Sequence, residues 1–205
     1  MSYERNDCRM CGAQVTRVLT LMPTPVANSF PDAPNAGAFY QLGLRQCVSC
    51  AHVQIGHVIE DAVLYGEDYK YSTPDALKPY LEERAAALRK AYPEAANVLE
   101  IGANNGIFLH ALHDAGFKQV IGIDPAGQDP LVWNMPFGPK AAELIVRRVG
   151  AIDLIVANNV FAHIDDLDAI FKSITEVLSL RGSLVFEVQY LPALVALSAF
   201  DMIYH

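Results

Sequence analysis

Residues 97–106 read NVLEIGANNG, and this stretch is the strongest indication of the fold class. Its first five residues are mostly apolar, which predicts a strand buried in a parallel sheet. Gly102 and Gly106 then bracket a short turn, and residues 106–115 have the apolar spacing of a helix. A strand that runs through a glycine turn into a helix is typical of α/β folds.

Strand and helix patterns alternate on both sides of this turn. Alternation of apolar strands with helices predicts a parallel sheet covered on both faces. We expect helices at residues 79–92 and 166–178, and further strands at residues 119–124, 152–158 and 183–190.

The first sixty residues differ in composition from the rest of the chain. Turn-forming residues are frequent at 22–25 and 31–37, and short β-like runs lie between them at 15–19 and 39–44. Such a segment buries little apolar surface and needs a cross-link, such as a disulfide or a bound metal, to fold. We therefore expect three parts: a small β-rich domain at residues 1–60, a connecting segment and helix at 61–93, and an α/β domain at 94–205.

The four cysteines can supply that cross-link. They form two C-x-x-C hooks, Cys8 with Cys11 and Cys47 with Cys50, separated by 35 residues. Four thiolates at such spacing match a closed tetrahedral zinc site, which leaves no open position for catalysis. Two disulfides or four free thiols are the alternatives, and a cytoplasmic location disfavours the disulfides.

Charge and hydropathy exclude several classes of protein. The 205 residues include 15 basic and 23 acidic ones, giving a net charge of −8. This balance argues against a nucleic-acid partner or a basic membrane-surface protein. The longest apolar run, residues 190–200, is too short to span a bilayer, and the polar N-terminus does not resemble a signal peptide. We expect a cytoplasmic protein, and the sequence does not fix its oligomeric state.

Polar residues around the glycine turn suit an adenosyl cofactor. Glu100 disfavours a phosphate and suits a cation such as the ammonium or sulfonium of S-adenosylmethionine. Gly102 permits close approach of a ligand, and Asn104 tolerates left-handed backbone. Asp124, which ends the next strand, can accept hydrogen bonds from both ribose hydroxyls. Asn158 ends another strand at the edge where open sheets bind ligands; a turn that binds nothing, with Asn158 as a simple cap, is the alternative.

Several motifs follow one another along nearly the whole chain. After the zinc hooks come YGEDYKY (65–71), LEIGANNG (99–106), IGIDP (121–125), VANNVFAHIDDL (156–167), GSLVFEVQYL (182–191) and IYH (203–205). In this order they resemble the nucleotide-sugar C-methyltransferases. These enzymes use S-adenosylmethionine to methylate C3 of nucleotide-linked 4-keto-deoxysugars and carry an N-terminal zinc-binding domain.

The resemblance implies a Rossmann-like class I methyltransferase domain over residues 94–205, with structural Zn²⁺ in the first domain. In the implied reaction a base removes the C3 proton, and the enolate attacks the cofactor methyl group. Tyr71 and Tyr204 match family tyrosines whose hydroxyls can stabilise the enolate oxygen, with ordinary packing as the alternative. Asn105 replaces the usual aspartate of the family turn and remains a candidate cofactor residue with one charge fewer.

Two departures from the family are visible. Residues 127–130 replace an expected helix, and residues 131–133 are all that remains of the next strand. The chain also ends inside the family's Tyr-(His/Asp)-Glu-His signature, so we expect these 205 residues alone to bind cofactor but to methylate little or nothing. Another small-molecule O- or N-methyltransferase, or a catalytically incompetent fragment that binds zinc and cofactor, is the alternative.

Overall fold

The computed structural model describes residues 2–30, 37–66, 69–199 and 202–204. Part of the turn-rich stretch, two residues of the YGEDYKY motif and His205 lie outside the described residues. Two compact units are present, Met1–Tyr71 with Gln189–His205, and Ser72–Val188. Contacts thus group residues 189–205 with the first unit, whereas the sequence grouped them with the sheet. The division at residues 60 and 93 stays a prediction.

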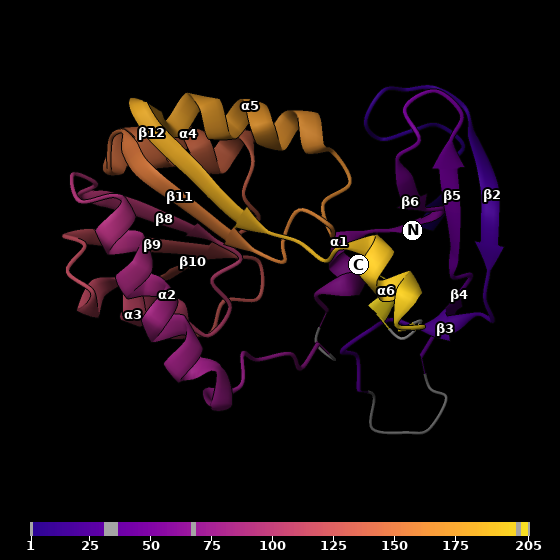
Figure 1. The fold of residues 1–205 in the computed structure, drawn as a ribbon, viewed down its shortest axis with the longest axis horizontal. Helices are drawn as coiled ribbons and strands as arrows, with labels where there is room; N and C mark the ends of the chain where they lie inside the picture. The colour runs from indigo at the N-terminus through magenta and orange to yellow at the C-terminus, as the bar shows by residue number, and fades with distance from the viewer. Residues whose placement is uncertain (1, 31–36, 67–68, 200–201, 205) are drawn as a thin grey trace. The chain divides into compact units, whose positions relative to one another are not determined.

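The second unit is built on a five-stranded parallel sheet with strand order β10-β9-β8-β11-β12 (Figure 1). Its strands are β8 (Asn97–Ile101), β9 (Gln119–Asp124), β10 (Val132–Asn134), β11 (Ile152–Asn158) and β12 (Leu178–Glu187). The prediction was wrong for β12, which begins five residues before position 183. Its register against β11 shifts between Ile152 and Leu154, so a bulge accommodates the additional residues of β12.

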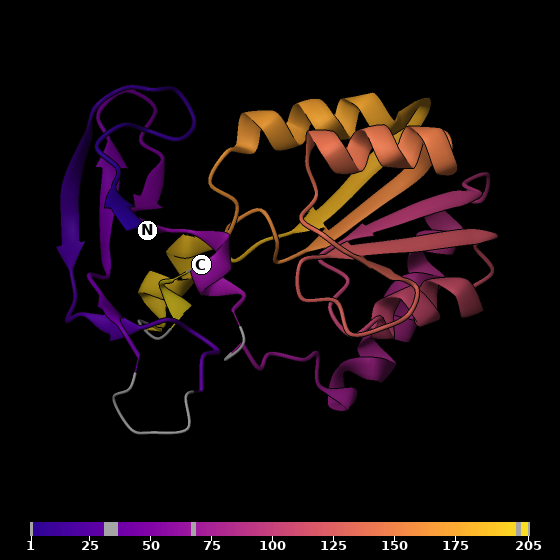
Figure 2. The same cartoon turned by 180° about the vertical axis from the view of Figure 1, so that it is seen from behind.

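Helices cover both faces of this sheet (Figures 1 and 2). A short 3-10 helix (Asp75–Leu77) leads into α2 (Lys78–Ala91), which packs with α3 (Ile107–Asp114) on one face. The other face is covered by α4 (Pro139–Arg148) and α5 (Leu167–Val177). Residues 127–130 form no helix, as the sequence predicted.

Strand side chains alternate between the two cores, as a period of two requires. On β8, Val98 lies in the core beneath α2 and α3, whereas Leu99 and Ile101 lie in the core beneath α4 and α5. The same alternation places four polar residues on the α2–α3 side, at the carboxyl halves of four neighbouring strands: Glu100, Asp124, Asn158 and Glu187.

The first unit consists of short antiparallel pieces. Strands β2 (Val15–Thr20), β5 (Gly43–Cys47) and β6 (Val53–Ile55) form one sheet; β1 (Ser2–Glu4) pairs with β7 (His57–Ile59), and β3 (Thr24–Pro25) with β4 (Phe39–Tyr40). Two short helices, α1 (Asp61–Leu64) and α6 (Leu191–Ala196), complete the unit.

The first unit has a small core. Its cluster of buried apolar residues consists of Cys8, Val15 and Cys47, with Ala13 packed against it. A core of this size needs additional stabilisation from a cross-link, such as a bound metal, as the sequence indicated. Among the helices that the structure describes, none combines the length and the apolar character needed to cross a membrane.

Candidate cofactor and zinc sites

The turn after β8 is left-handed at three positions. Gly102, Asn104 and Gly106 have φ values of 77°, 45° and 76°. A Cβ atom at Gly102 would lie 2.4 Å from Cγ2 of Val160, and one at Gly106 would lie 2.7 Å from Cβ of Asp129. Glycine is therefore required at both ends of the turn, and the expected left-handed backbone at Asn104 is confirmed.

Asp124 closes this turn from the neighbouring strand. Its Oδ2 accepts the N–H of Asn104 at 3.0 Å, and its Oδ1 accepts the N–H of Ala126 at 2.7 Å. Burial raises the pKa of Asp124, while these two N–H groups act to lower it. Each carboxylate oxygen can accept a second hydrogen bond. The side chain is thus held in place and can still accept from two hydroxyl groups.

Glu100 is a buried acceptor beside the turn, only 4% exposed. Its Oε2 accepts no hydrogen bond from any residue that the structure describes. Burial, followed by the charge of Asp124, raises the pKa of Glu100 from 4.5 to about 8, while Arg84 acts to lower it. A buried carboxylate without a donor is costly, so this site fits a ligand that brings a positive charge.

Asn158 adds a second acceptor on the same side of the sheet. Its Oδ1 is buried and likewise has no hydrogen-bond partner within the described part of the chain. Together with Glu100, this amide oxygen fits a ligand rich in donors, such as an ammonium group and hydroxyls.

The side chains of the two asparagines in the turn have partners in the preceding segment. Asn104 Oδ1 accepts the N–H of Thr73 at 2.9 Å. Asn105 Nδ2 donates to Ser72 Oγ and to the carbonyl oxygen of Thr73, both at 2.9 Å. These bonds fasten residues 72–73 to the turn. Contact of Asn104 and Asn105 with a cofactor would therefore involve their backbone.

A charged network beside these residues was missed by the sequence analysis. Arg84 on α2 forms an ion pair with Glu187 at the end of β12, and Glu187 Oε1 accepts from Asn159 Nδ2 at 3.0 Å. The ion pair joins positions 103 residues apart. Glu187 lies in the GSLVFEVQYL motif, but nothing in the local sequence around it or around Arg84 indicates that the two residues pair.

The four cysteines of the first unit come together as predicted. Their Sγ atoms all lie within 4.8 Å of one another, and three pairs are separated by 3.5–3.6 Å. A tetrahedral Zn²⁺ with Zn–S bonds of about 2.3 Å requires sulfur–sulfur distances of about 3.8 Å. None of the four is in a disulfide. The cluster therefore has the ligands and spacing of a closed structural zinc site: Cys8, Cys11, Cys47 and Cys50.

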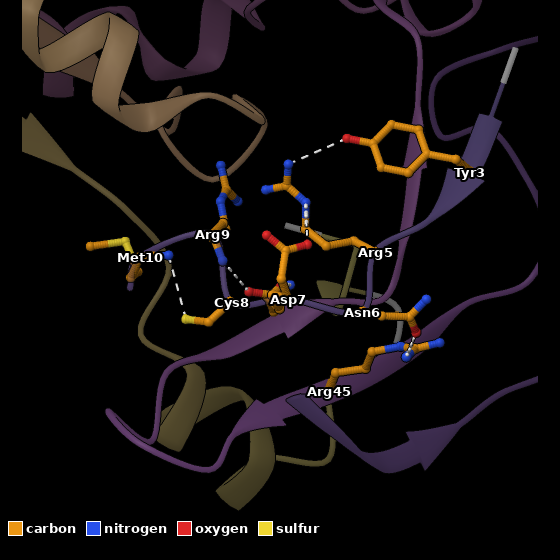
Figure 3. A network of polar contacts seen from close by, with 9 residues as sticks. Tyr3, Arg5, Asn6, Asp7, Cys8, Arg9, Met10 and Arg45 are labelled. Atoms are coloured by element: carbon orange, nitrogen blue, oxygen red, sulfur yellow. Dashed lines mark hydrogen bonds and ion pairs between the residues drawn. The ribbon is translucent and has the colours of Figure 1, made fainter. Parts of the chain in front are cut away.

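Backbone N–H groups point at two of these sulfurs. Met10 N lies 3.4 Å from Cys8 Sγ, and the N atoms of Ser49 and Cys50 lie 3.3 and 3.4 Å from Cys47 Sγ (Figure 3 for Cys8). The N–H groups of Cys50 and then Ser49 help lower the pKa of Cys47 to about 6. In the second hook, these N–H groups thus stabilise the thiolate form of Cys47, which is the form that binds metal.

Polar side chains fix the segment that leads into the first hook. The buried Arg45 donates to Asn6 Oδ1 (Figure 3) and also to Glu4 Oε1, both at 2.7 Å. The buried Gln54 donates to the carbonyl oxygen of Asp7 and accepts the N–H of Arg9, both at 2.9 Å. These bonds hold Cys8 in position before the metal binds.

One Zn²⁺ per chain is expected in the purified protein, because four thiolates converge on one point. Elemental analysis after gel filtration gives the metal-to-protein ratio. A ratio near zero in protein purified with zinc and reductant would contradict the assignment.

The two candidate catalytic tyrosines belong to the first unit, whereas the candidate cofactor residues belong to the second. Tyr71 is 40% exposed and Tyr204 is half-buried. Their role at the substrate therefore stays a prediction from the sequence.

Comparisons with known proteins match two parts of the chain to known domain families. The family described as "Methyltransferase domain" matches residues 70–202, and the family described as "Putative zinc binding domain" matches residues 8–65. C-methyltransferase NovU of Streptomyces niveus is 31% identical over 216 residues, which cover 98% of this chain and 51% of NovU. The chain thus spans about half the length of the curated relative it matches.

Solved structures are similar to a lesser degree. DesVI of Streptomyces venezuelae is 18% identical with a TM-score of 0.40, over 58% of this chain and 54% of DesVI. The SAM-dependent methyltransferase from Agrobacterium tumefaciens is 13% identical with a TM-score of 0.46, over 82% of this chain and 59% of that one. The assignment rests on the family match, which covers more than half of the chain. The chain therefore belongs to the methyltransferase domain family, whose cofactor is S-adenosylmethionine.

Proposed function

We propose that this chain holds S-adenosylmethionine at the carboxyl edge of its sheet for methyl transfer to a carbon of a nucleotide-linked 4-keto-deoxysugar. The observation that carries the cofactor site is the pair of buried acceptors, Glu100 Oε2 and Asn158 Oδ1, on one side of the sheet beside the glycine turn. Two buried acceptors without donors fit the ammonium and hydroxyl groups of this cofactor.

Each residue has a defined task in this proposal. When bound, the cofactor supplies an electrophilic methyl group on its sulfonium. Glu100 accepts from the ammonium group, Asp124 accepts from the ribose hydroxyls, and Asn158 orients the ligand from the neighbouring strand. Gly102 leaves room for the ligand to approach the backbone.

The backbone of Asn104 and Asn105 lines the turn in this proposal. Their side chains hold residues 72–73, as described above. Gly102 and Gly106 set the left-handed course of the turn between them.

The substrate assignment is supported by the order of sequence motifs and by the similarity to NovU, which is named a C-methyltransferase. In the proposed reaction a base removes the proton from the carbon beside the ketone, and the enolate oxygen accepts hydrogen bonds from Tyr71 and Tyr204. A small-molecule substrate and a cytoplasmic location are parts of the same proposal.

The test has a binding arm and a product arm. Calorimetry with S-adenosylhomocysteine measures the cofactor site, and absence of binding would refute the whole proposal. Methyl-labelled S-adenosylmethionine and a nucleotide-linked 4-keto-deoxysugar are then incubated with the protein, and the product is analysed by NMR. Because these 205 residues alone are expected to methylate little, the protein concentration is high and the incubation is long; a new carbon-bound methyl group then supports the proposal. A methyl group on oxygen or nitrogen would contradict carbon transfer.

Asp124→Ala should weaken binding of S-adenosylhomocysteine by about 1–3 kcal/mol, because two ribose hydroxyls lose their acceptor. Asp153→Ala is the matched control. Asp153 also accepts two backbone N–H groups, from Ala96 and Asn97, but near the amino ends of the strands. Calorimetry should show a loss of affinity in the first variant alone. Equal losses in both would assign Asp124 a structural role only.

A further inference from the structure

A charged network lies on the α2–α3 side of the sheet, next to the proposed cofactor residues. Arg84 of α2, whose side chain is 17% exposed, forms an ion pair with Glu187 Oε2. Tyr80, one helical turn earlier, donates to the same Oε2 at 3.4 Å and accepts from Arg84 Nη1 at 3.2 Å. Although burial opposes ionisation, the bond from Arg84 lowers the pKa of Glu187, so the pair is charged near neutral pH. The network fastens α2 to the end of β12.

Glu187 in turn fixes the residue that follows β11. Its Oε1 accepts from Asn159 Nδ2 at 3.0 Å, and its carbonyl oxygen accepts the N–H of Asn159 at 2.7 Å. Asn159 has φ of 56°, a left-handed conformation that needs such support. The preceding residue is Asn158, whose buried Oδ1 faces the site. The position of Asn158 therefore depends on Glu187, and the orientation of Glu187 depends on Arg84.

Arg84 also acts on Glu100, which points to the same side of the sheet. Among the described residues, the charged groups that act on Glu100 are Asp124 of β9 and Arg84 of α2. Asp124 raises the pKa of Glu100, and Arg84 lowers it. From β11 the residue paired with Glu100 is the apolar Val156, and from β9 it is Gly122. Arg84 is thus the cation that favours the charged form of Glu100.

We propose that Arg84 is a positioning residue of the cofactor site: through its ion pair with Glu187 it holds the Asn158–Asn159 turn, and it places its positive charge on the side of the sheet where Glu100 would accept a cofactor ammonium. The inference rests on the proposed function, because it assumes that the cofactor binds beside Glu100. Glu187 and Glu100 share the charge of one guanidinium, so loss of either partner changes the electrostatic field at the other.

The test follows the affinity for S-adenosylhomocysteine by calorimetry between pH 6 and 9. Arg84→Met removes the charge and the hydrogen bonds, Arg84→Lys keeps the charge, and Glu187→Gln removes the partner's charge. Arg89→Met is the matched control on the same helix. Arg89 donates to the carbonyl oxygens of Pro93 and Ala95, before the amino end of β8, so its loss affects packing but not Glu100.

Wild-type affinity should rise with pH and reach half of its plateau value near pH 8, which we call the levelling-off point. It should be about tenfold lower at pH 7 than on the plateau. Arg84→Met should lower the affinity and move the levelling-off point to higher pH, and Arg84→Lys should restore that point. Glu187→Gln should also lower the affinity, because the Asn159 turn loosens. It should move the point to lower pH, because the charge of Arg84 then acts on Glu100 alone. Arg89→Met should leave the point unchanged.

Arg84→Met and Glu187→Gln should shift the levelling-off point in opposite directions. Structural damage alone would not produce shifts of opposite sign in the two variants. An unchanged levelling-off point in Arg84→Met, or a shift in the same direction in Arg84→Met and Glu187→Gln, would overturn the inference. Full affinity in Arg84→Met would overturn it as well. Failure of the wild-type protein to bind S-adenosylhomocysteine at any pH would instead refute the proposed function.

Discussion

Cys47→Ser should remove the zinc and unfold the first unit while the second unit stays folded. Cys47 is both a member of the sulfur cluster and one of three residues in the first unit's small core. Structural zinc contributes about 10–16 kcal/mol in zinc-finger peptides, which equals or exceeds the whole stability of a typical domain. A serine hydroxyl does not replace the thiolate. The second unit has two apolar cores of its own and needs no metal.

The single tryptophan makes this outcome measurable. Trp133 is the only tryptophan of the chain and lies on β10, in the second unit. Its emission spectrum and urea midpoint should change little in Cys47→Ser, whereas zinc content falls from one per chain to near zero. Limited proteolysis should cut within residues 1–71. Because residues 189–205 belong to the same unit, they should become sensitive together with them.

Ser49→Ala is the control for Cys47→Ser. Ser49 lies in the same hook, but only its backbone N–H contacts a sulfur atom, so this variant should keep its zinc. A Cys47→Ser protein that retains one zinc with wild-type affinity would show that the cysteine is not a ligand. If Cys47→Ser also lost the urea unfolding transition that Trp133 emission reports, the two units would not fold separately.

The strands that position the candidate cofactor site could be predicted from local sequence. Residues 119–124 and 152–158 were expected as strands and form β9 and β11 with those bounds. Each is a short apolar run, and such runs bury well on both faces of a parallel sheet. Strand β12 was expected to begin at Ser183, but it begins at Leu178 and includes residues 179–182. The bulge opposite β11 that keeps these residues in the strand is a long-range effect and leaves no local signal.

The site was predictable only where the backbone dictates it. Gly102 and Asp124 were expected because a glycine turn and a strand-end carboxylate occupy positions that the topology fixes. The contacts of the Asn105 side chain with residues 72–73 could not be foreseen, because they depend on how the segment before α2 returns to the turn. The Arg84–Glu187 ion pair depends in the same way on the packing of α2 against β12.

Glu100→Gln should stabilise the second unit at pH 8 and weaken cofactor binding in the same protein. The pKa of Glu100 is raised to about 8, chiefly by burial and then by Asp124, from an ordinary value of 4.5. Between these two values the native state holds a proton that the unfolded chain has released. Raising the pH through this window therefore lowers the free energy of unfolding, by at most about 1.4 kcal/mol per pH unit.

Glutamine has the shape of the protonated carboxyl and does not titrate. The stability of Glu100→Gln relative to wild type should thus grow from near zero at pH 5 to on the order of 2–4 kcal/mol at pH 8. Urea unfolding followed by Trp133 emission measures this difference in the unit that contains Glu100. Glu176→Gln, at an exposed position of α5, is the control for the exchange of a glutamate for a glutamine.

Cofactor binding should change in the opposite direction. At pH 8 the ammonium group of S-adenosylhomocysteine loses a charged acceptor, which costs about 1.5–3 kcal/mol for a hydrogen bond to a charged group. A substitution that raises the stability of the free protein and lowers its affinity for the cofactor identifies a binding residue. A loss of affinity alone is weaker evidence. If Glu100→Gln lowered stability at every pH, the carboxylate would have a donor within the fold, and the cationic ligand would no longer be needed to explain its burial.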